Sequence, residues 1–267
     1  MAEPKRRFID GEYGQIHLRM AAPEKPTAPP LYCLHMSPKS GRQFERFMRA
    51  ASDDRIVVAS DYPGYGESAP PPAEPHVCVA DYARSVWRVA DALGHTKVDL
   101  FGHHTGSKVA AEMTYIAPER VNRIVMVSAA MLTDEERAAF NAYFSPIPLD
   151  EEGTRFKVMW ERIIHFKGPG MTLEMMAESM AENLRGGENY EWGHRAAFVY
   201  GTRFDDIIRM LPHRITILNP KDELHEHTKR ARPLLRNGEI IDYPEWGHGF
   251  LDVFTEDAVR AVKAALR

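Results

Sequence analysis

The sequence lacks several features that define whole classes of proteins. It has only two cysteines in 267 residues, too few for a disulfide framework. No uncharged apolar stretch approaches the roughly 18 residues of a membrane span, and the first residues carry no apolar signal segment. Lysines and arginines number 34 against 38 acidic residues, which leaves no basic excess for nucleic-acid phosphates. We therefore expect no membrane span, no nucleic-acid partner and, by default, a cytoplasmic protein.

The sequence does contain an alternation of strand-like and helix-like segments. Short apolar runs of strand length, several of them continuous as in strands buried on both faces, lie at 15–21, 31–35, 55–60, 97–102, 123–128, 214–219 and 238–243. Apolar residues recur at helical spacing between or after them at 79–94, 105–119 and 255–266. This alternation predicts an α/β fold with a mostly parallel central sheet flanked by helices. The basic residues at 5–7 are expected to form a solvated end.

One long segment interrupts the alternation. Residues 131–212 hold no convincing strand but several helical stretches that are rich in methionine and aromatic residues. We expect this segment to be a helical cap, or lid, on a core domain formed by 1–130 and 213–267. Packing of the cap onto the core is the simpler explanation of its large apolar side chains. The functional explanation is that some of them line a pocket beneath the cap.

The segment 98–113, VDLFGHHTGSKVAAEM, combines a buried strand, a sharp turn and a helix. Gly102 and Gly106 flank the turn, where a tight bend leaves no room for side chains beside a strained central residue. This spacing puts His104 at the tip, in the position that a nucleophile elbow gives to its reactive residue. Ser107 lies three residues farther on, inside the first helical turn, and is expected to point elsewhere.

Four further motifs, together with the elbow, make the sequence resemble the α/β-hydrolase superfamily over nearly the whole chain. Besides the elbow, LHMSPKSG resembles the family's oxyanion-hole loop, DYPGYGES its Asp-x-Pro-Gly-x-Gly-x-Ser turn, NPKDE the segment with its acid and WGHGF the loop with its histidine. The order elbow, cap, acid, histidine is also the family's order. The resemblance implies an α/β-hydrolase fold with the helical cap inserted after the sixth strand.

The resemblance also implies an active site when it is carried over position by position. His248 is then the general base, and Asp222 is the carboxylate that fixes its tautomer. The backbone N–H groups of Ser37 and Thr105 form the oxyanion hole, in which two donors stabilise one developing negative charge.

Two positions depart from the family's pattern. Met36 replaces the usual glycine after His35, which can reshape the oxyanion loop or narrow the pocket. His104 replaces the nucleophile. Three chemistries stay open for it: attack on a carbonyl through an acyl-imidazole, acid–base activation of water together with His248, and proton abstraction for elimination, C–C cleavage or isomerisation.

The first two chemistries have the same outcome, so the leading hypothesis is a hydrolase of a small, partly apolar ester, lactone or thioester. The alternatives are a cofactor-independent lyase, isomerase or C–C bond-cleaving enzyme, and a ligand-binding protein whose nucleophile has been lost. No cofactor is predicted, and a metal held by His104, His248 and Asp222 is disfavoured because no sequence spacing supports it. We expect a small-molecule substrate. A homodimer is a possible assembly.

Overall fold

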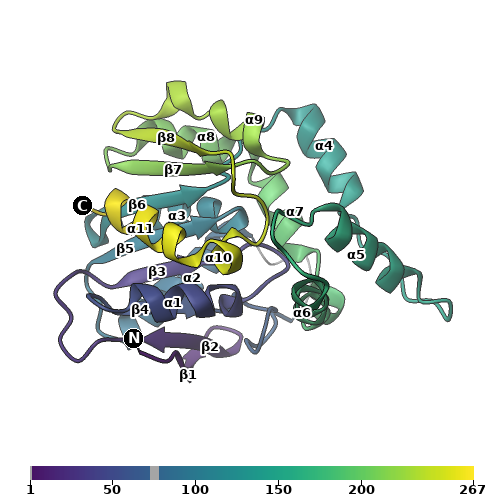
Figure 1. Ribbon diagram of the computed structural model, residues 1–267, viewed down its shortest axis with the longest axis horizontal. Helices are drawn as coiled ribbons and strands as arrows, with labels where there is room; N and C mark the ends of the chain where they lie inside the picture. Colours follow the sequence, from purple (N-terminus) through teal and green to yellow (C-terminus); the bar gives the residue numbers. More distant parts are fainter. Residues whose placement is uncertain (1, 73–77) are drawn as a thin grey trace.

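A single sheet forms the centre of the protein in a computed structural model that describes residues 2–72 and 78–267. Within these residues the sheet has eight strands, in the order β1-β2-β4-β3-β5-β6-β7-β8 (Figure 1). The strands are β1 (Lys5–Gly11), β2 (Gly14–Ala21), β3 (Leu31–Leu34), β4 (Val57–Ser60), β5 (Val98–His103), β6 (Val121–Val127), β7 (Ile215–Pro220) and β8 (Gly238–Tyr243). Pairing is antiparallel from β1 to β2 and from β2 to β4, and parallel elsewhere. The predicted α/β fold with a mostly parallel sheet is confirmed.

Helices cover both faces of the sheet, and each face has its own apolar core. One core packs side chains of the sheet against α2 (Val79–Ala92), α3 (Thr105–Ile116) and α8 (Gly201–Met210). The other packs them against α1 (Glu45–Ala51), α10 (Phe250–Val253) and α11 (Thr255–Ala265). Strands β3, β4, β5 and β7 are buried along their whole length, which explains why they read as continuous apolar runs rather than as alternating ones.

Residues 5–7 are exposed, as expected of a solvated end, but they also belong to strand β1, which the sequence did not predict. Its residues are mostly exposed, yet all seven pair with β2 through a hairpin at Gly11 and Gly14. The strand is held by backbone pairing at the edge of the sheet, so its side chains carry no apolar alternation that a sequence pattern could reveal. Charged residues on an exposed edge also discourage pairing with other chains.

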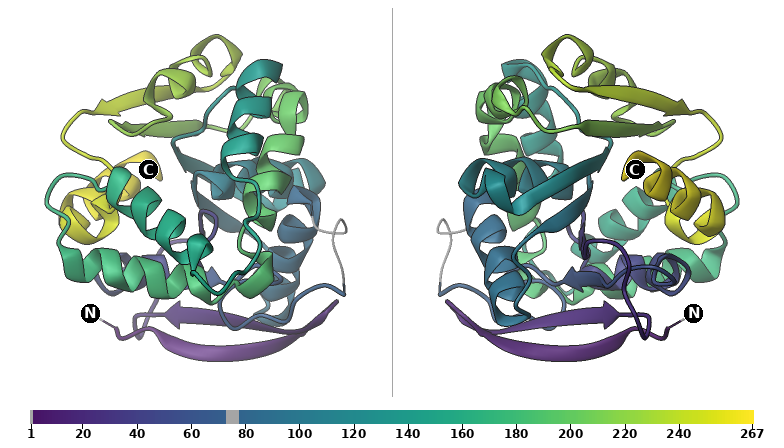
Figure 2. Two further views of the ribbon diagram at one scale, coloured as in Figure 1. Left: turned by 90° about the vertical axis from the view of Figure 1, so that its right-hand side faces the viewer. Right: turned by 90° about the vertical axis from the view of Figure 1, so that its left-hand side faces the viewer.

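The chain between β6 and β7 is helical, as predicted. It forms α4 (Asp134–Tyr143), α5 (Thr154–His165), α6 (Leu173–Leu184), α7 (Trp192–Val199) and α8. The first four helices gather at one end of the sheet, and Figure 2 (left) looks onto them from that end. Helix α8 lies inside the predicted cap of 131–212. Its residues Phe204, Ile207 and Ile208, however, belong to the same apolar core as α2 and α3. By its packing α8 is therefore part of the core layer.

The helices of the structure are short. Within the described ranges, none is long and apolar enough to cross a membrane.

Candidate active site

A strained turn places His104 at the end of β5. Its φ of 51° lies in the left-handed region, which a residue with a side chain adopts rarely and mostly at functional sites. Both flanking glycines are required, because a Cβ at Gly102 would lie 2.3 Å from the Gly106 carbonyl oxygen and one at Gly106 would lie 1.9 Å from the Leu34 carbonyl oxygen. Ser107 donates its hydroxyl to the Gly102 carbonyl oxygen and is fully buried, so it points away from the tip as expected.

Asp222 holds the ring of His104. The Nε2 atom of His104 lies 3.0 Å from Oδ2 of Asp222, whose side chain is only 2% exposed. The Ser128 hydroxyl donates to the same oxygen, and the Leu224 N–H donates to Oδ1 at 2.9 Å. Burial would raise the pKa of Asp222, but the hydrogen bond and positive charge offered by His104 outweigh it and hold that pKa below its usual value. An ionised carboxylate only accepts, so Nε2 of His104 carries a proton and a neutral ring has its lone pair on Nδ1.

Glu223 holds the second histidine. Its Oε2 atom lies 2.6 Å from Nε2 of His248, and its Oε1 atom lies 3.9 Å from Nδ1 of His104. The two imidazole rings have their centroids 5.4 Å apart. Burial would lower the pKa of His248, but the adjacent Glu223 carboxylate raises it above the usual value. The site therefore contains two histidine–carboxylate pairs side by side.

This pairing corrects the expectation that Asp222 orients His248. In the structure Asp222 contacts His104, and His248 takes Glu223 instead. An imidazole extends farther from the backbone than a serine hydroxyl, so His104 reaches the carboxylate that a shorter residue would leave to His248. Sequence reasoning missed Glu223, although its position directly after Asp222 in NPKDE was a usable signal.

The loop after β3 is positioned by a buried histidine. His35 stacks on Tyr62 with ring centroids 3.8 Å apart, accepts the Tyr62 N–H at Nε2 and donates from Nδ1 to the Met36 carbonyl oxygen at 2.9 Å. Burial lowers the pKa of His35 to about 4 and so keeps the ring neutral. Ser37 and Thr105 line the same pocket as His104. Thr105 opens α3, so its N–H lacks an intrahelical acceptor. The oxyanion-hole roles of these two residues stay predictions.

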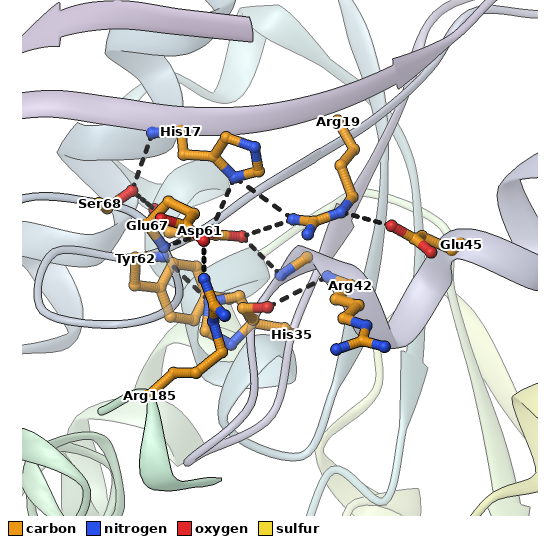
Figure 3. A network of polar contacts seen from close by, with 12 residues as sticks. His17, Arg19, His35, Arg42, Glu45, Asp61, Tyr62, Glu67, Ser68 and Arg185 are labelled. Atoms are coloured by element: carbon orange, nitrogen blue, oxygen red, sulfur yellow. Dashed lines mark hydrogen bonds and ion pairs between the residues drawn. The ribbon is translucent and has the colours of Figure 1, made fainter. Parts of the chain in front are cut away.

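The DYPGYGES segment contacts this loop through Asp61 (Figure 3). Its Asp61 is fully buried and accepts from the ring of His17 at 2.8 Å and from the backbone N–H groups of Gly41 and Glu67, both at 2.9 Å. Arg19 approaches the same carboxylate at 3.4 Å. This network joins β2, the loop after β3 and the turn after β4, so we assign it a structural role.

A cavity of about 160 Å³ lies above His104, between the core and the cap. Its walls are largely apolar and come from α4 to α7 as well as from the core. Phe166, Met171 and Met176 line it, which agrees with the hypothesis that large apolar side chains of this segment line a pocket. Lys39 and Lys108 also line it, and burial lowers the pKa of each to about 8.

Comparisons with known proteins agree with this architecture. A family model described as the alpha/beta hydrolase fold matches residues 29–153. An esterase from Exiguobacterium antarcticum superimposes with a TM-score of 0.80, covering 98% of this chain and 99% of that one at 17% sequence identity. The chain has the α/β-hydrolase fold.

Curated relatives of this α/β-hydrolase fold protein are distant. A serine hydrolase-like protein from Danio rerio is 30% identical over 98 residues, which are 37% of this chain and 30% of that protein. A putative carbamate hydrolase, RutD, from Caulobacter segnis is 25% identical over 82% of this chain and 85% of its own length. The chain thus spans only about a third of the first of these relatives, and both carry hydrolase names.

The α/β-hydrolase fold also brings together a set of groups that could hold a metal ion. One ligand atom each from His104, Glu223 and His248 lie within 4.8 Å of one another. This set differs from the one considered from the sequence, because Glu223 takes the place of Asp222.

Proposed function

We propose that the chain is a hydrolase of a small, partly apolar acyl compound of the ester, lactone or thioester class. One observation carries the proposal. The strained tip of the elbow presents His104 to the pocket while Asp222 holds its Nε2 atom. The remaining nitrogen, Nδ1, is then the basic atom at the position of the family's nucleophile. Strain retained at the tip of such a turn is typical of a working site.

Two routes use this nitrogen. Nδ1 attacks the acyl carbon to give an acyl-imidazole that water then hydrolyses, or Nδ1 takes a proton from a water molecule that attacks the same carbon. In both routes the backbone N–H groups of Ser37 and Thr105 stabilise the oxygen that becomes negative. His248, held by Glu223, returns a proton to the leaving group.

The pocket supports a small and partly apolar substrate. Its walls carry phenylalanine and methionine side chains from the cap, and its volume is about 160 Å³. Methionine and aromatic side chains adapt to apolar ligands of varied shape. Because the pocket is enclosed by both the core and the cap, we propose a small molecule rather than a polymer as the substrate.

A lyase or isomerase is the second candidate. The observation that favours it is the presence of two separate histidine–carboxylate pairs, with ring centroids 5.4 Å apart. Two such pairs can remove a proton from one substrate atom and deliver one to another.

The test is an assay of purified protein with activated esters, lactones and thioesters. Both the rate of product formation and the chemical identity of the products are determined. We expect hydrolysis by the wild type, loss of about 10³-fold or more in kcat/KM for His104→Ala, and no change for His213→Gln, a histidine outside the pocket. An inert wild type combined with activity gained only by His104→Ser would reject the hydrolase. Products that have not gained the elements of water would support the lyase or isomerase.

A further inference from the structure

The three groups around Glu223 have the spacing of metal ligands. Oε1 of Glu223 lies 3.9 Å from Nδ1 of His104, and Oε2 lies 2.6 Å from Nε2 of His248. The ligand atoms of all three residues fall within 4.8 Å of one another. Zinc bonds of about 2.1 Å at tetrahedral angles put ligand atoms about 3.4 Å apart. Small rotations of these side chains are therefore enough to meet one ion.

The second nitrogen of His104 is already oriented for this purpose. Histidines that bind metal through one ring nitrogen almost always donate the other N–H to a carboxylate or carbonyl group. Here Nε2 of His104 is 3.0 Å from Asp222, and Asp222 is in turn held by the Ser128 hydroxyl and the Leu224 N–H. This chain of contacts fixes the ring so that Nδ1 faces Glu223.

The charge of the site also suits a cation. Two carboxylates, Asp222 and Glu223, lie beside the two imidazoles. Three positively charged side chains, Lys39, Lys108 and Arg162, also line the pocket. The Nζ atom of Lys39 is held by α6 through the Ser179 carbonyl oxygen at 2.9 Å and the Ser179 hydroxyl at 2.6 Å. His104, Glu223 and His248 all line the pocket, so an ion among them would have an open side toward a substrate.

We propose that His104, Glu223 and His248 bind one divalent transition-metal ion, with zinc as the ion to test. Two histidines, one glutamate and one open position form a known ligand set of catalytic zinc. The ion would polarise a substrate carbonyl or lower the pKa of a bound water. The inference shares its site with the proposed hydrolase and deepens it, because water then replaces His104 as the attacking group.

Metal binding is measured directly and without a substrate. The purified full chain is stripped with a chelator and titrated with Zn²⁺ in a calorimeter, and with Co²⁺ while visible absorption is recorded. We expect one ion per chain and the visible bands of four- or five-coordinate cobalt. Asp222→Asn should weaken binding about 10- to 100-fold, because the asparagine amide can donate to Nε2 of His104 and leave the ring proton on Nδ1, the atom that would bind the ion. His213→Gln should leave binding unchanged.

The ligand variants decide whether the ion sits in this site. Glu223→Gln and His248→Gln should each abolish the cobalt bands, with circular dichroism confirming that both variants fold. No binding by the wild type, or equal binding by wild type and both variants, would overturn the inference.

Activity separates this inference from the proposed function. Hydrolysis by a wild type that binds no metal would reject the metal site and leave the hydrolase standing. Specific metal binding without hydrolysis of any tested acyl compound, in stripped or zinc-loaded protein, would do the reverse.

Discussion

Two histidine–aspartate pairs in this molecule have similar contact distances but different surroundings. His17 and Asp61 are 2.8 Å apart and both are fully buried. His104 and Asp222 are 3.0 Å apart, but the histidine is 11% exposed and lines the pocket. The carboxylate of Asp61 also accepts backbone N–H groups from two different loops, whereas Asp222 is held mainly by residues of the site itself.

The comparison teaches that a buried histidine–aspartate contact does not by itself indicate chemistry. The His17–Asp61 pair beside the loop after β3 is fully buried and fixes three segments of chain relative to one another. The His104–Asp222 pair at the elbow leaves Nδ1 of His104 unpaired with Asp222. This atom faces Glu223, and the ring of His248 lies next to it. Removing a charge should therefore affect stability at Asp61 and catalysis at Asp222.

The largest effect is expected for Asp222→Asn on catalysis. An asparagine amide can donate to Nε2 of His104 and so favour the wrong tautomer, with the lone pair turned away from the pocket. The same change in a serine protease triad costs about 10⁴-fold in kcat. We expect a loss of similar size in kcat with the preferred acyl substrate, and a melting temperature close to that of the wild type. A large loss of stability without a loss of kcat would contradict the distinction between the two pairs.

Asp61→Asn should give the opposite result. Breaking a buried ion pair by removing one partner costs about 3–5 kcal/mol of unfolding free energy, because the other partner stays buried without compensation. Here Arg19 would keep its contact to Glu45, which limits the loss. Urea denaturation measures the effect, and kcat per folded molecule should change little. Equal stability of the variant and the wild type would show that the sealed network is not structural.

The sequence predicted most of the fold because burial leaves a readable pattern. Strands such as β5 and β7 lie between two helical layers and appear as continuous apolar runs, while the long helix α2 shows helical spacing and ends before Gly94 in the left-handed region. Strand β1 left no such signal, since backbone pairing holds it at an exposed edge. Helix α8 was assigned to the cap because its packing partner cannot be read from spacing.

The sequence predicted that three residues of the candidate site lie together, but not how they pair. Motif order identified His104, Asp222 and His248, and all three lie close together. The choice between Asp222 and Glu223 as partner of His248 depends on which way two adjacent side chains point after β7 and on the reach of an imidazole at the tip. Neither quantity is encoded in a motif, so the sequence offers Glu223 only as the neighbour of Asp222, and the structure shows its contact to His248.

His35→Gln tests the loop after β3, which the His17–Asp61 pair holds through Gly41. The pKa of His35 is lowered from 6.5 to about 4 in the folded protein by burial. Between pH 6.5 and 4 the unfolded chain therefore binds a proton that the folded protein does not, and stability falls as the pH falls. The shift corresponds to about 3 kcal/mol. Urea denaturation of wild type and variant at several pH values measures this effect. Between pH 6.5 and 4 the variant should lose about 3 kcal/mol less unfolding free energy than the wild type. Equal pH dependence of the two proteins would contradict the lowered pKa of His35.

The smallest effect is expected at Ser128, which connects the elbow to β6. Its hydroxyl donates to the Asp222 oxygen that also contacts His104. A hydrogen bond to a charged group contributes about 1.5–3 kcal/mol, and part of this is recovered by rearrangement, so Ser128→Ala should lower kcat about 10-fold. Ser107→Ala is the matched control, because that buried hydroxyl donates to the carbonyl oxygens of Gly102 and Val127 and does not contact Asp222. It should lower stability with a smaller effect on kcat. Equal losses of kcat in both variants would mean that Ser128 acts through the geometry of the turn rather than through Asp222.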